Sequence, residues 1–158
     1  MEREERFMRL ALQEAEQAMA LGEVPVGAVI VRGDEVVSMG HNLRETGKNA
    51  LAHAEIIAIN RACQALGGWR LHQCELYVTL EPCPMCSGAI INSRIQRVVY
   101  GAADDKAGCM GSVADFCAYP FNHKPQVVRG VLEEECQALL QQFFQYLREK
   151  RKASQRCV

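Results

Sequence analysis

Residues 75–86 read Glu-Leu-Tyr-Val-Thr-Leu-Glu-Pro-Cys-Pro-Met-Cys, a strand-like run that leads directly into two cysteines. Proline is tolerated in the first turn of a helix, so Pro84 favours a helix that begins beside the cysteines. At that position a C-x-x-C spacing lets both sulfurs point the same way, and the helix dipole stabilises thiolates. The stretch predicts a strand over 75–80 and a helix over about 84–92 with two thiols at its start.

A second stretch, His53-Ala54-Glu55, opens another predicted helix, over residues 52–66. A catalytic zinc ion usually has three protein ligands and keeps a fourth position for water. His53, Cys83 and Cys86 supply three ligands. Glu55 lies two residues past His53 and cannot share its direction, but it can lie near the metal-bound water as a general base and then a general acid.

Each motif alone also fits a less specific interpretation. A C-x-x-C pair can be a redox pair or half of a structural zinc site, and a histidine and a glutamate on a helix surface are common. The order of the motifs, the strand-like sequence between them and Pro82 ahead of Cys83 favour the combined pattern H-x-E…P-C-x-x-C. That pattern is typical of zinc-dependent nucleobase deaminases.

Length and composition limit the number of domains and the classes of protein that the chain can represent. The chain has 158 residues, a net charge of −1 and eight cysteines. We expect one domain over 1–158, and the charge argues against a nucleic-acid binder that is basic throughout. No apolar signal segment opens the chain and no run approaches a membrane span, so we expect a cytoplasmic protein without a membrane partner. Six cysteines have no ligand spacing and are interpreted as structural or surface thiols: Cys63, Cys74, Cys109, Cys117, Cys136 and Cys157.

Periodicity and turn residues predict the other elements, and no internal repeat is found. They are a helix over 3–21, a hairpin of strands 24–31 and 35–39, strands over 97–101 and 126–131, and a final helix from 132 to about 152. Gly27 is either a bulge or a close approach of a ligand. From the residues alone, Asn42 is best explained as a turn residue. The loop 102–112 leaves the carboxyl end of a strand, where open α/β sheets usually build their sites.

The end of the last helix is basic. Residues 148–156 hold five basic residues and one acidic residue, and Phe143, Phe144 and Tyr146 lie just upstream. One interpretation of this tail (about 148–158) is a solvated helix end with cations at its negative pole. The other is a phosphate-binding strip beside aromatic rings on which bases stack.

Beyond the zinc motif, further stretches resemble a known family. They are residues 23–28, 52–55, 77–83, 98–102, 111–112, 122–123 and 130–132. From about Phe7 to Arg148 the chain resembles bacterial tRNA-specific adenosine deaminases of the cytidine-deaminase-like superfamily. The resemblance implies an α/β fold, a three-layer α/β/α sandwich with a five-stranded mixed sheet, and a homodimer.

The resemblance also implies a role for each candidate residue. His53, Cys83 and Cys86 would bind one Zn²⁺ per subunit, and Glu55 would shuttle protons. The target nucleoside would be held by Asn42, Val26 and Ala54, the neighbouring anticodon nucleotides by Asp104, Lys106, Asn122 and His123, and the flanking RNA by Arg44, Phe144 and Arg148. The partner would be a tRNA anticodon stem-loop. The reaction would be hydrolytic deamination of adenosine to inosine at the wobble position, by zinc-activated water.

Two alternatives stay open. A deaminase of a free base or nucleoside, such as cytosine, cytidine or guanine, would use the same zinc and Glu55 but would not need Asp104, Lys106 or the basic terminus. A non-enzymatic partner subunit or RNA-binding module with a structural zinc would need neither Glu55 nor an open metal position.

Overall fold

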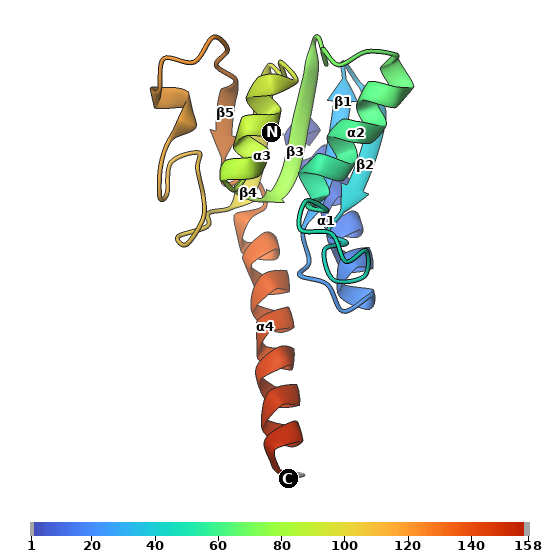
Figure 1. Cartoon of the computed structure of the whole chain (residues 1–158), viewed down its shortest axis with the longest axis vertical. Helices are drawn as coiled ribbons and strands as arrows, with labels where there is room; N and C mark the ends of the chain where they lie inside the picture. Colours follow the sequence, from blue (N-terminus) through green and yellow to red (C-terminus); the bar gives the residue numbers. More distant parts are fainter. Residues whose placement is uncertain (1, 157–158) are drawn as a thin grey trace.

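The fold is a five-stranded sheet between two layers of helices (Figure 1), in a computed structural model that describes residues 2–156. The predicted three-layer α/β/α sandwich is therefore confirmed. In chain order the elements are α1 (Glu2–Ala20), β1 (Gly27–Arg32), β2 (Glu35–His41), α2 (Ala54–Leu66), β3 (Cys74–Leu80), α3 (Pro84–Asn92), β4 (Arg97–Ala102), the short 3₁₀ helix η1 (Phe116–Ala118), β5 (Gln126–Arg129) and α4 (Glu133–Arg156).

The sheet is mixed, with strand order β2-β1-β3-β4-β5. β1 runs antiparallel to both β2 and β3, whereas β3, β4 and β5 are parallel. As a result, one edge of the sheet, the edge formed by strand ends, holds the carboxyl ends of β2, β3 and β4 and the amino end of β1. The helices that follow this edge, α2 and α3, begin there.

Alternate residues of the strands face the two helical layers, as the pleat requires. Leu76 and Val78 of β3 pack in one core with α2 and Ile90 of α3. Tyr77 packs in the other core with Phe7 of α1 and Cys136 of α4. β3 is buried on both faces, which explains why its sequence is almost continuously apolar.

Two glycines let the helices approach the sheet closely. A Cβ atom on Gly27 would lie 1.9 Å from the carbonyl oxygen of Ala11 in α1, and one on Gly40 would lie 2.8 Å from that of Ala54 in α2. Neither sequence interpretation of Gly27 is correct: the register shift of β1 lies at Ile30/Val31, and the group that approaches Gly27 is the backbone of α1 and not a ligand.

Ion pairs connect α1 to the opposite edge of the sheet, where β3 and β4 begin. Glu75 of β3 accepts from Arg3 at 2.8 Å and from Arg97 at 2.9 Å, and Arg97 also pairs with Glu4 at 2.8 Å. Glu75 is only 8% exposed, so two guanidinium groups offset the cost of burying its charge. This network lies at the edge of the sheet opposite to the amino ends of α2 and α3.

Several element boundaries differ from those predicted. The first strand begins at Gly27 and not at Val24, because residues 24–26 form a turn in which the N–H of Val26 donates to the carbonyl of Val24. The helix expected over 52–66 begins at Ala54, and β5 ends at Arg129 before Gly130, whose φ is +79°. The predicted span of α3, residues 84–92, is confirmed.

α4 is longer than expected and continues to Arg156. Figure 1 shows that its second half leaves the sheet and extends away from the body of the molecule. Phe143 is the last buried residue of this helix. Among residues 2–156, no helix is both long and apolar enough to span a bilayer.

Gly27→Ala is expected to lower the free energy of unfolding by about 2–3 kcal/mol, since the new methyl group would overlap the backbone of α1. Urea denaturation followed by circular dichroism measures the change. The control is Gly68→Ala, where a Cβ meets nothing within 4 Å. Equal stability of the two variants would contradict the close packing of α1 on β1.

Candidate active site and metal centre

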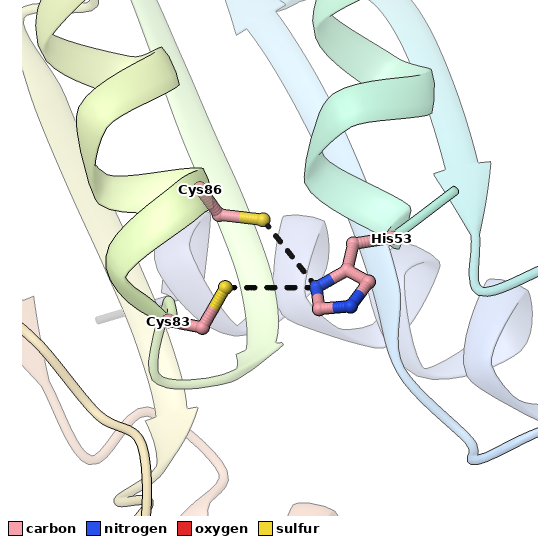
Figure 2. A group of neighbouring side chains, drawn as sticks. All are labelled: His53, Cys83 and Cys86. Carbon is pink, nitrogen blue, oxygen red and sulfur yellow. Dashed lines mark hydrogen bonds between the residues drawn. The ribbon is translucent and has the colours of Figure 1, made fainter. Parts of the chain in front are cut away.

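The three predicted metal ligands meet between α2 and α3 (Figure 2). His53 is the N-cap residue of α2 and Cys83 is the N-cap residue of α3, both with extended backbone. Cys86 lies in the first turn of α3 and is buried. Because both helices begin at the same edge of the sheet, their first turns bring the three ligand atoms within 4.8 Å of one another.

The distances between the ligand atoms fit a tetrahedral zinc ion. The Nδ1 atom of His53 lies 3.6 Å from the Sγ of Cys83 and 3.6 Å from the Sγ of Cys86. Zn–S bonds of about 2.3 Å and Zn–N bonds of about 2.0–2.1 Å place sulfur and nitrogen about 3.6 Å apart in a tetrahedron. Within the described residues, no fourth His, Cys, Asp or Glu joins this group, which is the ligand count of a catalytic zinc site.

The electrostatics of the site suit metal binding. Hydrogen bonding to Cys86 and His53 lowers the pKa of Cys83 to about 4, so this thiol is ionised at neutral pH. The pKa of Cys86 is raised, because it shares a hydrogen bond with Cys83 and is buried. A zinc ion would displace that remaining proton, since metals bind the thiolate form.

Glu55 stands beside the ligands without joining them. It lies in the first turn of α2 and is only 4% exposed. Burial raises its pKa to about 7, and the neighbouring Cys83 acts in the same direction. A carboxyl group with a pKa near 7 can both accept and donate a proton at neutral pH, as a general acid–base catalyst must.

A pocket of about 220 Å³ opens onto His53, Glu55 and Cys83. Five further candidate residues line it: Val26, Asn42, Arg44, Ala54 and Asp104. Residues that the sequence analysis did not select line it as well: Val24, Leu80, Glu81 and Ala107. The turn at 24–26 explains Val24 and Val26, because it directs the chain before β1 into the pocket.

Asn42 is buried at the end of β2. Its Oδ1 accepts from the N–H of Arg44 at 3.1 Å, and its Nδ2 donates to the carbonyl of Val24 at 3.3 Å. The interpretation of Asn42 as a turn residue is therefore correct. The same bonds fix its amide at the pocket wall, where one N–H and one lone pair are left for a ligand.

The other candidate residues lie outside the pocket. Lys106 is exposed on the loop after Asp104, and its N–H donates to the Asp104 carboxylate at 3.0 Å. Asn122 is exposed, and the ring of His123 donates from Nε2 to the carbonyl of Ile95 at 2.7 Å. Phe144 and Arg148 lie on the exposed second half of α4. The structure does not bring these five residues together: Lys106 lies on the loop after β4, Phe144 and Arg148 lie on α4, and Asn122 and His123 precede β5 at the edge of the sheet opposite to the pocket.

The remaining thiols do not join the metal group. Cys74, Cys109 and Cys136 are buried, whereas Cys63 and Cys117 are partly buried. Their interpretation as structural or surface thiols stays a prediction. Cys157 lies outside the described residues.

Comparison with known proteins gives three consistent findings. The family described as "Cytidine and deoxycytidylate deaminase zinc-binding region" matches residues 1–102. The tRNA-specific adenosine deaminase of Bacillus subtilis is 50% identical over 157 residues, which is 99% of this chain and 98% of that protein. The tRNA-specific adenosine deaminase of Haemophilus influenzae is 48% identical over 94% of this chain and 87% of that protein.

Solved structures agree with this relationship. A structure from a study of A-to-I editing by tRNA:A34 deaminases has a TM-score of 0.83 and 45% identity, and it covers 85% of this chain and 99% of that one. A guanine deaminase from Nitrosomonas europaea has a TM-score of 0.73 and 26% identity, with coverage of 88% and 83%. The more similar of these two structures thus comes from a study of tRNA deaminases.

Cys86→Ala is expected to weaken zinc binding by more than about 100-fold. Loss of a residue that only hydrogen-bonds a metal ligand already lowers metal affinity about 10–100-fold, and Cys86 is expected to bind the metal directly. Competition with a chromogenic chelator measures the affinity. Cys109→Ala, which removes a buried thiol outside the ligand group, should keep the affinity of the unmodified protein. Equal affinity of the two variants would remove Cys86 from the metal site.

Proposed function

The chain belongs to the cytidine and deoxycytidylate deaminase zinc-binding family and, within it, to the tRNA-specific adenosine deaminases, and on this basis we propose that it converts adenosine to inosine at the wobble position of a tRNA anticodon. The observation that carries the proposal is a pocket in which a three-ligand metal site and a buried glutamate face the same space. One zinc ion per subunit, held by His53, Cys83 and Cys86, is part of the proposal.

The chemistry divides between the metal and Glu55. When bound, zinc supplies a Lewis acid that lowers the pKa of a coordinated water from 15.7 to about 7. Glu55 accepts a proton from the attacking water and delivers it to N1 of adenine as the oxygen adds to C6. Glu55 then takes the hydroxyl proton and passes it to the amino group. The C6–N bond breaks, ammonia leaves, and inosine remains. The position of Glu55, buried in the pocket beside His53 and Cys83, supports both proton transfers.

The pocket residues would orient the base. Val26 and Ala54 offer apolar surface to the ring, and the fixed amide of Asn42 would hydrogen-bond the nucleoside. The base must swing out of its loop to enter, at a cost of a few kcal/mol that is lowest for a nucleotide that is already unstacked. An anticodon loop meets that condition better than a duplex.

Residues at the pocket and others beyond it would contact the rest of the stem-loop. Arg44 and Asp104 stand at the pocket, and Lys106, Asn122 and His123 are proposed to meet the neighbouring anticodon nucleotides. Phe144 and Arg148 are proposed to meet the flanking RNA, since the exposed half of α4 presents five cations to solvent. A tRNA substrate would place the enzyme in the cytoplasm.

We also propose that the protein is a homodimer and that α3 contributes to the interface. Gly88 of α3 supports this, because a Cβ there would meet nothing within 4 Å and the helix surface is open to a second chain.

The proposed function is tested with a synthetic anticodon stem-loop that carries adenosine at the wobble position, beside free adenosine, cytidine and guanine. Inosine should form in the stem-loop alone. Turnover of a free base or nucleoside with the stem-loop untouched would establish the alternative substrate class. Zinc-loaded protein that is inert on all four would support the non-enzymatic alternative.

Glu55→Ala is expected to reduce deamination of the stem-loop by at least about 10²–10⁴-fold, the usual contribution of a positioned acid–base group. Zinc content and stem-loop affinity should stay close to those of the unmodified protein, since Glu55 is not a ligand. Single-turnover kinetics, metal analysis and equilibrium binding measure the three quantities. Retained turnover would remove Glu55 from the mechanism.

The triple change Lys150→Gln, Arg151→Gln, Lys152→Gln is expected to weaken stem-loop binding and to reduce the slope of log K against log salt. The reduction should be about 0.7–0.9 for each cation that contacts a phosphate. Arg70→Gln is the matched control, because Arg70 is exposed but follows the carboxyl end of α2, away from the pocket. An unchanged salt slope in the triple variant would support the other interpretation of the basic terminus, a solvated helix end.

A further inference from the structure

Two loops build opposite walls of the pocket. Residues 43–49 follow Asn42 and present Arg44, and residues 103–112 follow β4 and present Asp104 and Ala107. Neither loop belongs to a helix or a strand. What holds them in place decides where the pocket walls lie.

The second loop is wrapped around the side chain of Glu81, which is only 2% exposed. Its Oε1 accepts from the N–H of Asp104 at 3.1 Å and from the hydroxyl of Ser112. Its Oε2 accepts from the N–H of Met110 at 2.9 Å and from that of Ser112 at 3.1 Å. One carboxylate thus ties the start and the end of the loop to the residue just before Pro82 and Cys83.

The loop also closes tightly on this carboxylate. A Cβ on Gly108 would lie 2.5 Å from Oε2 of Glu81, so only glycine fits at that position without displacing the carboxylate. The N–H of Cys109 donates to the carbonyl of Pro82 at 2.9 Å. The position of the loop is therefore set relative to the strand end that carries the zinc ligand Cys83.

The first loop uses the same arrangement with Glu23, which is 1% exposed. Its two carboxylate oxygens accept from the N–H of Glu45 at 3.1 Å and from the N–H of Thr46 at 2.6 Å. In both loops the hydrogen-bond partners found in residues 2–156 are backbone N–H groups and a hydroxyl, that of Ser112 for Glu81 and that of Thr46 for Glu23, so the buried carboxylates interact with the loops themselves.

The loops need the carboxylate form of Glu81 and Glu23, and a side chain of the same size would not replace it. A carboxylate offers two oxygens that only accept, whereas the amide of glutamine offers one acceptor and two donors. A glutamine at either position would turn an NH₂ group toward backbone N–H groups. The loop would then have to move, or leave buried donors unsatisfied.

We propose that Glu81 and Glu23 are positioning residues for the deamination proposed above: each holds one loop so that Asp104 on one side and Arg44 on the other meet the substrate. Neither glutamate takes part in the chemical step. Their loss acts on substrate binding and leaves the zinc ligands and Glu55 in place.

The test uses the full-length zinc-loaded protein with Glu81→Gln and, separately, Glu23→Gln. Each is expected to raise KM for the anticodon stem-loop about tenfold while kcat changes less than about threefold, because uniform binding and not transition-state binding is lost. The control is Glu75→Gln, a third buried glutamate, whose partners Arg3 and Arg97 lie away from the pocket. It should lower stability and leave KM unchanged.

Amide hydrogen exchange gives a second readout that does not depend on the substrate. Glu81→Gln should speed exchange of the amides of Asp104, Met110 and Ser112 and leave those of Glu45 and Thr46 protected. Glu23→Gln should produce the opposite pattern. This readout applies even if the unmodified protein does not act on the stem-loop, so failure of the proposed function is distinguished from failure of the positioning role.

Two results would overturn the proposal. One is an unchanged KM in both variants with unchanged exchange of the two loops. The other is a general rise in exchange with loss of zinc, which would make both residues determinants of the whole fold. If Glu81→Gln does not fold, Ser112→Ala removes one of the four bonds and should raise KM in the same direction by a smaller factor.

Discussion

The structure depends on one constraint: two thiols and one imidazole must converge to within bonding range of one ion. Two helices that are far apart in the chain carry these three candidate ligands. His53 and Cys83 are both N-cap residues, and Cys86 follows in the same first turn. The mixed sheet meets the constraint because the reversal of β1 against β3 places the starts of α2 and α3 side by side. Gly40 then lets α2 rest close to β2. The distance of 3.6 Å between His53 and each cysteine is the outcome.

The same edge of the sheet gathers buried carboxylates, and each is stabilised differently. Glu55 has a raised pKa because burial is poorly compensated, which suits a group that exchanges protons. Glu81 and Glu23 are as deeply buried, but backbone N–H groups solvate them. Glu75, at the other edge, is neutralised by two arginines. Similar burial therefore yields one carboxyl group with a raised pKa, two that hold loops and one at the centre of an ion-pair network, according to what faces the oxygens.

Much of this architecture could be predicted from the sequence, because several signals are local. Pro84 predicted the start of α3, and the motif spacing predicted that His53, Cys83 and Cys86 would lie together, as they do in the structure. The start of β1 was missed, because Val24 and Val26 continue the apolar run although the chain turns there. The roles of Glu81 and Glu23 were missed for another reason: a glutamate is usually exposed, and only the folded loops reveal the donors that surround it. Lys106, Asn122, His123, Phe144 and Arg148 stay predictions that depend on an RNA ligand.

The projecting half of α4 is a segment whose helical order depends on interactions within the helix itself. Beyond Phe143 its residues, from Phe144 to Arg156, have little tertiary packing to stabilise them. Isolated helices shorter than about 12–15 residues are marginal in water, so this segment depends on the packed first half of α4 for its helical nucleus. Its turns can unwind and re-form without any change in the sheet. Unwinding of this segment would therefore leave the candidate metal site at the edge of the sheet unchanged.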